Sequence, residues 1–265
     1  MNVHTIILAA GQGSRMKSNK AKVLQRIGGT SMLEKICYTA GAVSSDITLV
    51  VGFDKESVLE EASNYNLNIT SSLQPKPIGT GDAVRCGLDK VQNDSKILVL
   101  YGDVPLIKKE TLQNLIDSSN SGLSILTTVL DKPFGYGRVK TNANNEALEI
   151  VEEKDATDKE RQIQEVFTGV ISGSKALIEE GLARITNNNA AGEFYLTDLV
   201  SIINEKGIRI NTYKASNEEV KGANSKQELE QLETTYRAMK AEDLFEKGIT
   251  INDASRLDVR GSVEC

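Results

Sequence analysis

The chain has 265 residues, of which 39% are hydrophobic, and a formal net charge of −6. This length is enough for one large α/β domain, or for one domain with an appendage. The acidic balance argues against a general nucleic-acid surface, no stretch approaches the roughly 20 apolar residues of a membrane span, and the first residues lack the pattern of a signal peptide.

Strand and helix patterns alternate through the first half of the chain. Apolar, β-branched runs predict strands over residues 5–9, 47–51 and 97–100, with helical patterns between them over 31–43, 55–63 and 80–91. Ser31 and Glu34 form a capping box at the first of these helices. The alternation predicts an α/β fold with a mostly parallel central sheet, whose ligands bind beyond the C-terminal ends of the strands.

Residues 8–16 read L-A-A-G-Q-G-S-R-M and follow directly on the first predicted strand. Gly11 and Gly13 have no Cβ, so the backbone can adopt positive φ angles there and a ligand can approach closely. Successive N–H groups in such a turn form an anion-binding concavity. Arg15 adds a planar cation that matches phosphate oxygens two at a time, so we interpret this loop as a phosphate-binding arrangement.

Two better-known glycine-rich loops do not fit these residues. The Walker A pattern G-x-x-x-x-G-K-[ST] is not met, and the dinucleotide fingerprint G-x-G-x-x-G requires a third glycine where this chain has Met16. The two glycines alone are equally typical of an ordinary strand-to-helix turn. Arg15 and Lys22 favour the binding loop.

The histidine and the cysteines point away from several chemistries. His4, the only histidine, lies inside the first strand, where a structural role is expected, and no nucleophile elbow G-x-S-x-G is present. Cys37, Cys86 and Cys265 are odd in number and far apart, which is typical of free thiols in a reducing cytoplasm rather than of disulfides or a zinc site. We therefore expect a cytoplasmic location.

The second half of the chain is predicted to be more mixed. Strand patterns over 123–130, 137–141, 147–151 and 166–171 have short connections, which indicates a mixed sheet or a β-rich subdomain covering the cleft.

A long helix is predicted over residues 225–247. Ser225 and Glu228 form its capping box, and Gly248 is a plausible stop. Its apolar stripe consists of Leu229, Leu232, Tyr236 and Met239.

Seven short motifs occur in order along the chain. They are the loop at 8–16, Gln74 followed by G-T-G at 79–81, Y-G-D-V-P at 101–105, G-Y-G-R at 135–138, I-V-E-E-K-D-A-T at 150–157, N-N-N-A-A-G-E-F-Y-L-T-D at 187–198 and V-K-G-A-N at 220–224. In this combination the chain resembles the uridyltransferase domain of bifunctional N-acetylglucosamine-1-phosphate uridyltransferase/glucosamine-1-phosphate acetyltransferases, which are sugar nucleotidyltransferases. The resemblance covers essentially the whole chain, up to L-D-V-R-G at 257–261.

This resemblance implies a Rossmann-like nucleotidyltransferase fold with a β-rich sugar-binding part. It also implies a Mg²⁺-dependent transfer of uridylyl from UTP to N-acetylglucosamine 1-phosphate. The products are UDP-N-acetylglucosamine, a precursor of cell-envelope polysaccharides, and pyrophosphate. Because the sugar phosphate brings its own nucleophile, such a reaction needs positioning and charge neutralisation more than covalent catalysis.

The resemblance also assigns expected roles to individual residues. Arg15 and Lys22 would neutralise charge on the pyrophosphate leaving group, and Asp103 and Asn224 would bind Mg²⁺. Gln74, whose amide both donates and accepts, would read the uracil edge together with Gly79 and Thr80. The remaining expected substrate contacts are Leu8, Ala9, Ala10, Gly11, Gly13, Tyr101 and Gly102, with Gly137 and Glu152 facing the sugar.

The same family predicts the organisation of the chain. We expect a nucleotidyltransferase domain over 1–224, the long helix over 225–248, and over 249–265 the start of a linker to a left-handed β-helix acetyltransferase. None of the hexapeptide repeats of that β-helix is present in this sequence. We therefore expect a shortened form without acetyltransferase activity, and a trimer only where the β-helix is present.

The sequence departs from the family at four positions. Ala21 replaces the proline usual before the lysine, Pro77 stands where the family often has glutamine, and Asp82 follows Gly81 where histidine or asparagine is frequent. Phe167 replaces an asparagine that contacts the sugar. Phenylalanine cannot make that hydrogen bond, so either the sugar is held differently or the specificity for the N-acetyl group is weakened.

Three other functions are compatible with the sequence. One is an enzyme of the same fold that uses a different sugar 1-phosphate or base. Another is a nucleotide-sugar binding module that has lost catalysis, although the retention of Arg15, Lys22, Asp103 and Asn224 argues against it. A molybdenum-cofactor guanylyltransferase would share the glycine loop but not the N-N-N-x-x-G-E run.

Overall fold

The computed structural model describes residues 2–261 and Val263. Nine strands form the central sheet in the order β11-β7-β10-β6-β1-β4-β5, from which the β8–β9 hairpin branches at β10. Their bounds are β1 Val3–Ala9, β4 Asp46–Val51, β5 Ile69–Leu73, β6 Lys96–Tyr101, β7 Leu123–Val129, β8 Arg138–Thr141, β9 Ala147–Val151, β10 Glu165–Ser174 and β11 Ile210–Lys214. Strands β2 (Arg26–Ile27) and β3 (Thr30–Ser31) form a separate two-stranded sheet.

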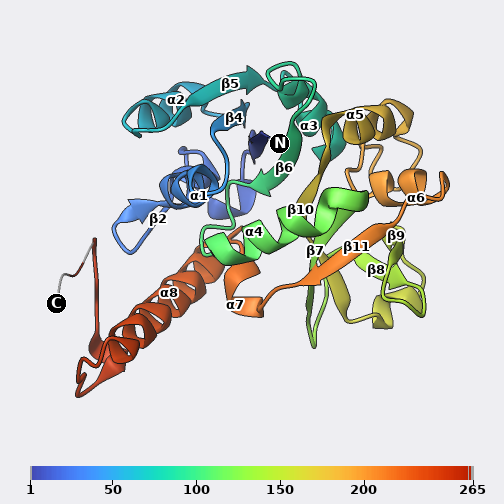
Figure 1. Cartoon of the computed structure of the whole chain (residues 1–265). Coiled ribbons are helices and arrows are strands. Elements are labelled where there is room, and N and C mark those ends of the chain that lie inside the picture. The colour runs from blue at the N-terminus through green and yellow to red at the C-terminus, as the bar shows by residue number, and fades with distance from the viewer. Residues whose placement is uncertain (1, 262, 264–265) are drawn as a thin grey trace.

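Helices cover both faces of the central sheet (Figure 1). Helices α3 (Thr80–Leu88), α5 (Lys175–Arg184) and α6 (Asp198–Asn204) pack on one face, and α1 (Met32–Gly41), α2 (Lys55–Ser63) and α4 (Lys109–Ser118) on the other. The remaining helical segments are α7 Asn217–Val220, α8 Lys226–Glu246 and the 3-10 turns η1 Ser14–Met16, η2 Lys22–Leu24, η3 Ser119–Ser121, η4 Glu160–Gln162 and η5 Ala254–Arg256.

The alternation of side chains along β1 explains why this strand lies in the middle of the sheet. Ile6 and Leu8 belong to the hydrophobic cluster under α3 and α5, whereas Ile7 and Ala9 belong to the cluster under α1 and α4. Successive side chains of a strand point to opposite faces, so a strand that is apolar on both faces must be covered on both. Its parallel neighbours β4 and β6 end at the same edge, where Leu8 pairs with Val50 and Tyr101.

The predicted elements of the first half are confirmed, with small shifts at their ends. Helix α2 has the predicted bounds, α1 begins after Ser31, whose hydroxyl accepts the N–H of Glu34 at 3.0 Å, and α3 ends at Leu88. His4 is buried and its Nε2 lies 2.7 Å from Thr48 Oγ1, which is the structural role expected for it.

The second half continues the same sheet, as the mixed-sheet alternative predicted. Strand β10 runs antiparallel to β6 and β7, and β11 runs parallel to β7. The β8–β9 hairpin belongs to this sheet but lies off its main strand order, because β8 pairs with β10 and β9 pairs only with β8. The sequence analysis made no prediction for β2, β3, β5 or β11, nor for helices α4 to α7. Strand β5 reads I-T-S-S-L and β11 reads I-N-T-Y-K, so their short runs contain few apolar residues.

Helix α8 extends away from the sheet at one end of the molecule (Figure 1). Its predicted stripe is confirmed, since Leu232 and Tyr236 are buried in a small cluster with Ile27 and Met32, and Leu229 and Met239 pack against it. Gly248 ends the helix with φ 81°, as predicted.

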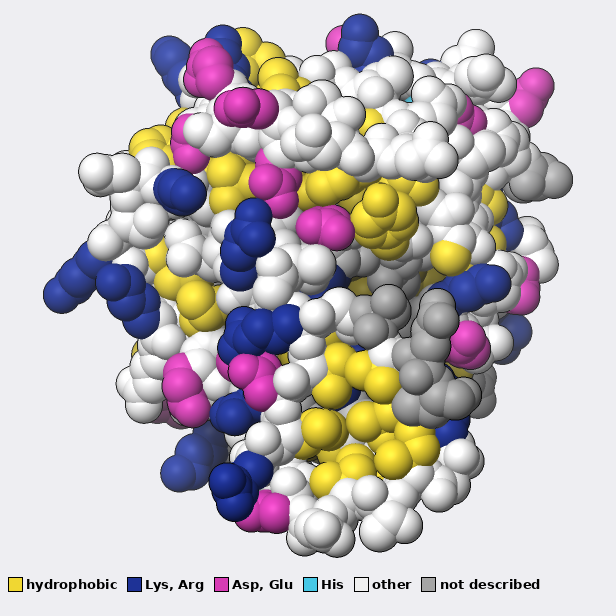
Figure 2. Space-filling view, turned by 90° about the vertical axis from the view of Figure 1, so that its left-hand side faces the viewer, with side chains coloured by type: hydrophobic (Ala, Val, Ile, Leu, Met, Phe, Trp, Pro, Cys, Tyr) yellow, Lys and Arg dark blue, Asp and Glu magenta, His cyan; other side chains and the backbone are white. Residues whose placement is uncertain are grey.

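Side chains of both charges are interspersed on the face shown in Figure 2, and hydrophobic side chains gather in its lower half. No helix within the described residues is long and apolar enough to cross a membrane. Cys37 and Cys86 are free thiols, while Cys265 lies outside the described residues, as do Ser262 and Glu264 of the predicted linker.

Candidate active site

A cavity of about 310 Å³ lies at the C-terminal ends of β1 and β6. This is the edge where parallel α/β sheets bind their ligands, and the volume suits a small molecule. Its walls include most of the residues predicted from the sequence to bind substrate. The lining residues are Leu8, Ala10, Gly11, Lys22, Val23, Gln74, Pro77, Gly79, Thr80, Ala83, Tyr101, Asp103 and Glu193.

Lys22, Asp103 and Asn224 meet at one end of this cavity. The ammonium of Lys22 is ion-paired with Asp103 Oδ2 and donates to Asn224 Oδ1 at 2.9 Å. Asp103 is only 8% exposed, so it depends on this cation for compensation. The structure therefore brings together three predicted residues that are up to 202 positions apart in the sequence.

The first turn of α8 fixes the position of Asn224, which lies two residues before the helix begins. The backbone N–H of Asn224 donates to Glu228 Oε2 at 2.6 Å, inside the predicted capping box of α8. A Cβ at Gly222 would lie 3.1 Å from the carbonyl oxygen of Asp103. The V-K-G-A-N motif thus packs directly against Asp103.

The backbone conformation expected for the glycine loop is confirmed at Gly13. Gly13 has φ 62°, and a Cβ there would lie 2.7 Å from Lys22 Cβ, so glycine is required on both counts. The expectation of a positive φ at Gly11 is wrong, because its φ lies outside that region. A Cβ at Gly11 would meet open space, so nothing in the described structure itself requires glycine there.

Other residues of the loop occupy different positions relative to the cavity. Arg15 lies in η1 and is exposed, and within the described residues it forms no ion pair. It therefore stands outside the cavity walls. Ala9 is buried and is not part of the cavity wall. Gly102 allows close packing, since a Cβ there would lie 2.9 Å from a methyl carbon of Val23, and its N–H donates to the carbonyl oxygen of Leu8 at 3.0 Å.

Ala21, which replaces the family's proline, forms a bond that proline cannot form. Its N–H donates to Asp54 Oδ2 at 2.9 Å, and its φ of −52° is one that proline would also adopt. The loop before Lys22 is thus fixed by a hydrogen bond instead of a ring.

Gln74, Gly79 and Thr80 form another part of the cavity wall, at the start of α3. Gln74 is buried, and its amide nitrogen donates to the carbonyl oxygen of Gly79 at 3.1 Å and to Asp82 Oδ2 at 2.9 Å. Gly79 has φ 132°, and a Cβ there would lie 2.4 Å from the carbonyl oxygen of Phe194. Glycine at this position is therefore required by the chain itself.

The N-N-N-A-A-G-E-F-Y-L-T-D run packs across this segment. The carbonyl oxygen of Phe194 accepts the N–H of Gly81, and the N–H of Phe194 donates to the carbonyl oxygen of Ile78, both at 2.8 Å. Thr80 Oγ1 accepts the N–H of Leu196 at 3.0 Å. These backbone contacts bring Glu193 into the cavity wall.

Gly137 and Glu152 lie together beside the cavity rather than in its wall. A Cβ at Gly137 would lie 3.6 Å from Glu152 Oε1, and this oxygen accepts the hydroxyl of Thr197 at 2.9 Å. Burial, and then the charges of Asp198, Asp155 and Glu193, raise the pKa of Glu152.

Tyr101 connects the cavity to the carboxylates beside it. It lines the cavity next to Thr80, and burial raises the pKa of its hydroxyl. Burial also raises the pKa of Asp198 to about 6, with further contributions from Asp155 and Glu149.

Two more departures from the family, Pro77 and Phe167, lie in different places relative to the cavity. Pro77 is exposed and lines the cavity. Phe167 is 6% exposed in the core cluster, and its backbone N–H donates to the carbonyl oxygen of Gly137 at 2.9 Å. Its ring packs in the core beside the Gly137 segment.

Sequence reasoning missed Asp82, Glu193, Thr197 and Asp198. The last three belong to a motif that was identified, so the signal was present, but one sequence does not tell which residues of a motif face a cavity. Asp82 was noted only as a difference from the family, and its partner Gln74 lies eight positions away, in the loop after β5.

The donor set at Asp103 and Asn224 fits Mg²⁺. A carboxylate oxygen and an amide oxygen already converge on one cationic atom, Lys22 Nζ, and hard oxygen donors are what Mg²⁺ prefers. The described residues contain no cluster of three or more His, Cys, Asp or Glu side chains able to hold a metal. Such a site relies on phosphates and waters for its other ligands, as Mg²⁺ sites usually do.

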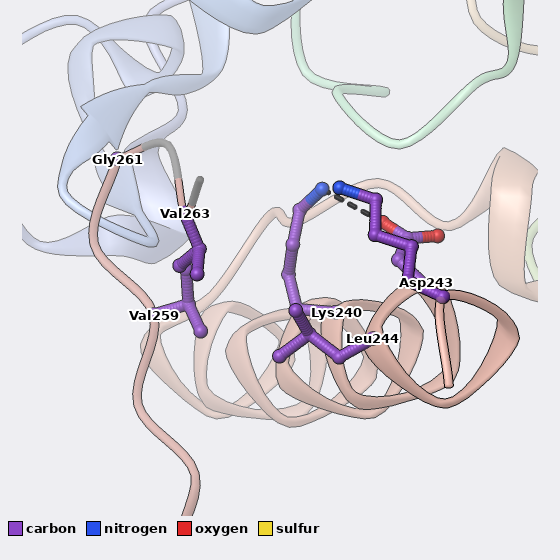
Figure 3. Close-up of a pocket in the computed structure, with 7 residues that line it drawn as sticks. Lys240, Asp243, Leu244, Val259, Gly261 and Val263 are labelled. Atoms are coloured by element: carbon purple, nitrogen blue, oxygen red, sulfur yellow. Dashed lines mark hydrogen bonds and ion pairs between the residues drawn. The ribbon is translucent and has the colours of Figure 1, made fainter. Parts of the chain in front are cut away.

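A second cavity, of about 220 Å³, lies at the C-terminal end of α8 (Figure 3). It is lined by Lys240, Asp243, Leu244, Lys247, Val259, Gly261 and Val263. Lys240 Nζ donates to Asp243 Oδ2 at 2.8 Å there. None of the residues predicted to bind substrate lines this second cavity, whereas most of them line the first.

The family model of the MobA-like NTP transferase domain matches residues 5–166. The chain belongs to this family. The match includes the glycine loop, Gln74 and Asp103 but ends before the N-N-N-A-A-G-E run.

The chain is also similar to curated proteins that are longer. It is 42% identical to the bifunctional protein GlmU of Methylococcus capsulatus, over 99% of this chain and 57% of that protein. It is 40% identical to the bifunctional protein GlmU of a Psychrobacter species, over 98% of this chain and 57% of that protein. The chain thus spans somewhat more than half the length of these relatives.

Two solved structures share the fold. A UDP-glucose pyrophosphorylase complexed with UDP-glucose superposes with a TM-score of 0.72 at 16% identity, covering 90% of this chain and 100% of that chain. A putative glucose-1-phosphate thymidylyltransferase from Bacillus anthracis gives a TM-score of 0.70 at 19% identity, covering 96% of this chain and 98% of that chain. They confirm the predicted Rossmann-like nucleotidyltransferase fold.

Proposed function

We propose that this chain transfers uridylyl from UTP to N-acetylglucosamine 1-phosphate, giving UDP-N-acetylglucosamine and pyrophosphate. The observation that carries the proposal is the convergence of Lys22, Asp103 and Asn224 at a cavity that Gln74 also lines. The similarity to GlmU proteins over nearly the whole chain supports this choice of substrates.

The chemistry is a displacement at phosphorus. A phosphate oxygen of the sugar phosphate forms a bond to the α-phosphorus of UTP, and the bond from that phosphorus to the bridging oxygen breaks, so pyrophosphate leaves with the electron pair. No serine or cysteine nucleophile is needed. The protein has to align the two substrates and neutralise the charge that develops on the leaving group.

We assign the residues the following roles, supported by the cavity lining and by the similarity to GlmU proteins. Gln74, Gly79 and Thr80 bind the base, and the backbone from Leu8 to Gly13 approaches the phosphates. Lys22 and Arg15 neutralise the leaving group, with Arg15 reaching in from its exposed position on η1. Gly137, Glu152 and Tyr101 hold the sugar hydroxyls.

Asp103 and Asn224 would hold Mg²⁺. The ion supplies positive charge that screens the phosphates from the incoming sugar phosphate. Lys22, which is held by these two residues in the free protein, is then available to the leaving group. We place this activity in the cytoplasm, where the free thiols Cys37 and Cys86 stay reduced.

Pyrophosphate release tests the proposal. Purified protein with UTP and N-acetylglucosamine 1-phosphate should release pyrophosphate in the presence of Mg²⁺, and chelation of the metal should abolish release. Omission of the sugar phosphate is the control. Binding of UDP-N-acetylglucosamine without any release would favour a binding module and contradict the proposal.

A second candidate is the same transfer to a different sugar 1-phosphate. It is favoured by Phe167, because a buried phenylalanine cannot supply the hydrogen bond of the family's asparagine. Comparison of several hexose 1-phosphates in the same assay decides between the two. A higher kcat/KM with a sugar that lacks the N-acetyl group would support the second candidate.

A further inference from the structure

We propose that Asp82 fixes the orientation of the Gln74 side-chain amide, and that the nucleotide cavity thereby selects uracil over cytosine. This inference rests on the proposed function, because it names the residue that sets the base preference of the same site. Asp82 lies at the start of α3, one turn from the cavity wall formed by Gly79 and Thr80.

The hydrogen bonds of Gln74 leave only one possible orientation. Its amide nitrogen is 3.1 Å from the carbonyl oxygen of Gly79 and 2.9 Å from the carboxylate of Asp82. A carbonyl and a carboxylate can only accept, so both N–H groups of the amide must point at them. The bond to the charged partner is the stronger of the two.

The amide oxygen of Gln74 is the group that remains for a ligand. Within the described residues no protein group donates to it. It is also absent from the set of buried side-chain atoms that lack a partner, so it is open to the cavity although Gln74 as a whole is 7% exposed. The cavity therefore presents a fixed acceptor at this point.

Backbone donors lie next to this acceptor. The N–H groups of Gly79 and Thr80 at the start of α3 have no partner among the described residues, and both residues line the cavity. An acceptor beside a donor complements uracil, which presents its ring N–H beside a carbonyl oxygen. Cytosine presents the reverse pair, an unprotonated ring nitrogen beside an amino group.

If the Gln74 amide turned over, the same wall would present donors only. Donors suit the ring nitrogen and carbonyl oxygen of cytosine, so the preference would be reduced or reversed. Asp82 prevents this because its carboxylate repels the amide oxygen. Asparagine has the same shape as aspartate but can donate as well as accept, so it would permit both orientations.

The variant Asp82→Asn tests this with a matched control, Asp89→Asn. Asp89 is exposed and caps the C-terminal end of α3, so each variant removes one negative charge at an end of this helix. In the pyrophosphate-release assay, we expect Asp82→Asn to lower the ratio of kcat/KM for UTP over CTP by about tenfold, mainly through the KM for UTP. Asp89→Asn should leave the ratio unchanged. An unchanged ratio in Asp82→Asn overturns the inference while leaving the uridylyltransferase proposal intact.

Binding measurements separate failure of this inference from failure of the proposed function. If the unaltered protein releases no pyrophosphate, calorimetry with UDP and CDP still measures the base preference and its loss in Asp82→Asn. Should that variant fail to fold, NMR of the unaltered protein provides an independent measurement. The two Nε2 protons of Gln74 should exchange slowly with solvent, with and without UDP. Fast exchange of these protons would overturn the inference.

Discussion

The cavity end at Lys22 and the region beside Glu152 compensate their charges in different ways. At Lys22, a buried carboxylate is paired with an ammonium, and an amide oxygen completes the contact. Beside Glu152, burial and neighbouring carboxylates raise the pKa values of Glu152 and Asp198. The first arrangement suits cations and phosphates, whereas the second favours neutral hydroxyl donors, which relieve repulsion between carboxylates without adding charge.

The largest effect is expected at the Lys22 end. Lys22→Ala removes a preorganised cation and leaves Asp103 unpaired, so turnover should fall by on the order of 10³. Steady-state pyrophosphate release measures this loss. The exposed neighbour Lys20 provides the control, since Lys20→Ala should retain the original rate within about twofold. Equal losses in both variants would show that the loop, not the paired lysine, matters.

The variant Arg15→Ala tests whether a residue outside the cavity wall contributes to the neutralisation of the leaving group. Arg15→Ala should lower turnover by about 10²-fold, because one charge contact to the leaving group is lost. Its free energy of unfolding should change by less than about 0.5 kcal/mol, since Arg15 is exposed. An unchanged rate of pyrophosphate release would remove Arg15 from the mechanism.

The variant Glu152→Gln tests whether the region beside Glu152 binds the sugar phosphate. The variant loses a carboxylate acceptor for sugar hydroxyls, so the KM for N-acetylglucosamine 1-phosphate should rise about tenfold, with the KM for UTP unchanged within about twofold. Glu149→Gln, which alters a partly exposed glutamate on β9, the strand that ends just before Glu152, is the control. A parallel rise in both KM values would mean that the two regions do not act separately.

A smaller effect is expected at the loop that carries Lys22. Ala21→Pro keeps the backbone angle but loses the bond to Asp54, and Asp54→Ala loses the same bond from its other side. In urea unfolding, Asp54→Ala should therefore cost about 1 kcal/mol more in the natural sequence than in the Ala21→Pro background. Equal costs in both backgrounds would show that this bond does not stabilise the loop.

The smallest effect is expected from Asp198 and depends on pH. Its pKa is raised from 3.8 to about 6 in the folded protein, so folding favours the protonated acid. The associated stability is present below pH 3.8 and is lost as the pH rises through 6. Asp198→Asn should therefore be more stable than the natural protein by about 1 kcal/mol at neutral pH, with solvent screening taken into account. Urea unfolding across this range should show the difference vanishing in acid, and a constant difference would contradict the assigned cause.

The two regions also differ in how far the sequence predicts them. At the Lys22 end, strand ends predicted that the glycine loop and Asp103 would meet. The family resemblance added Lys22 and Asn224, and the structure brings both to Asp103. Beside Glu152, the environment depends on a loop that packs across α3 through backbone hydrogen bonds of Phe194, which periodicity does not encode. The bonds of Gln74 to Asp82 and of Ala21 to Asp54 were missed for the same reason, because each joins elements whose contact is set by tertiary packing.

A crystal structure with Mg²⁺ and UDP-N-acetylglucosamine tests the central claim most directly. We predict that the uracil ring N–H will contact Gln74 Oε1, that the metal will be bound by Asp103 and Asn224, and that the sugar will lie towards Glu152. A nucleotide bound elsewhere, for example at the cavity beside α8, with Gln74 and Asp103 free of ligand, would contradict the account.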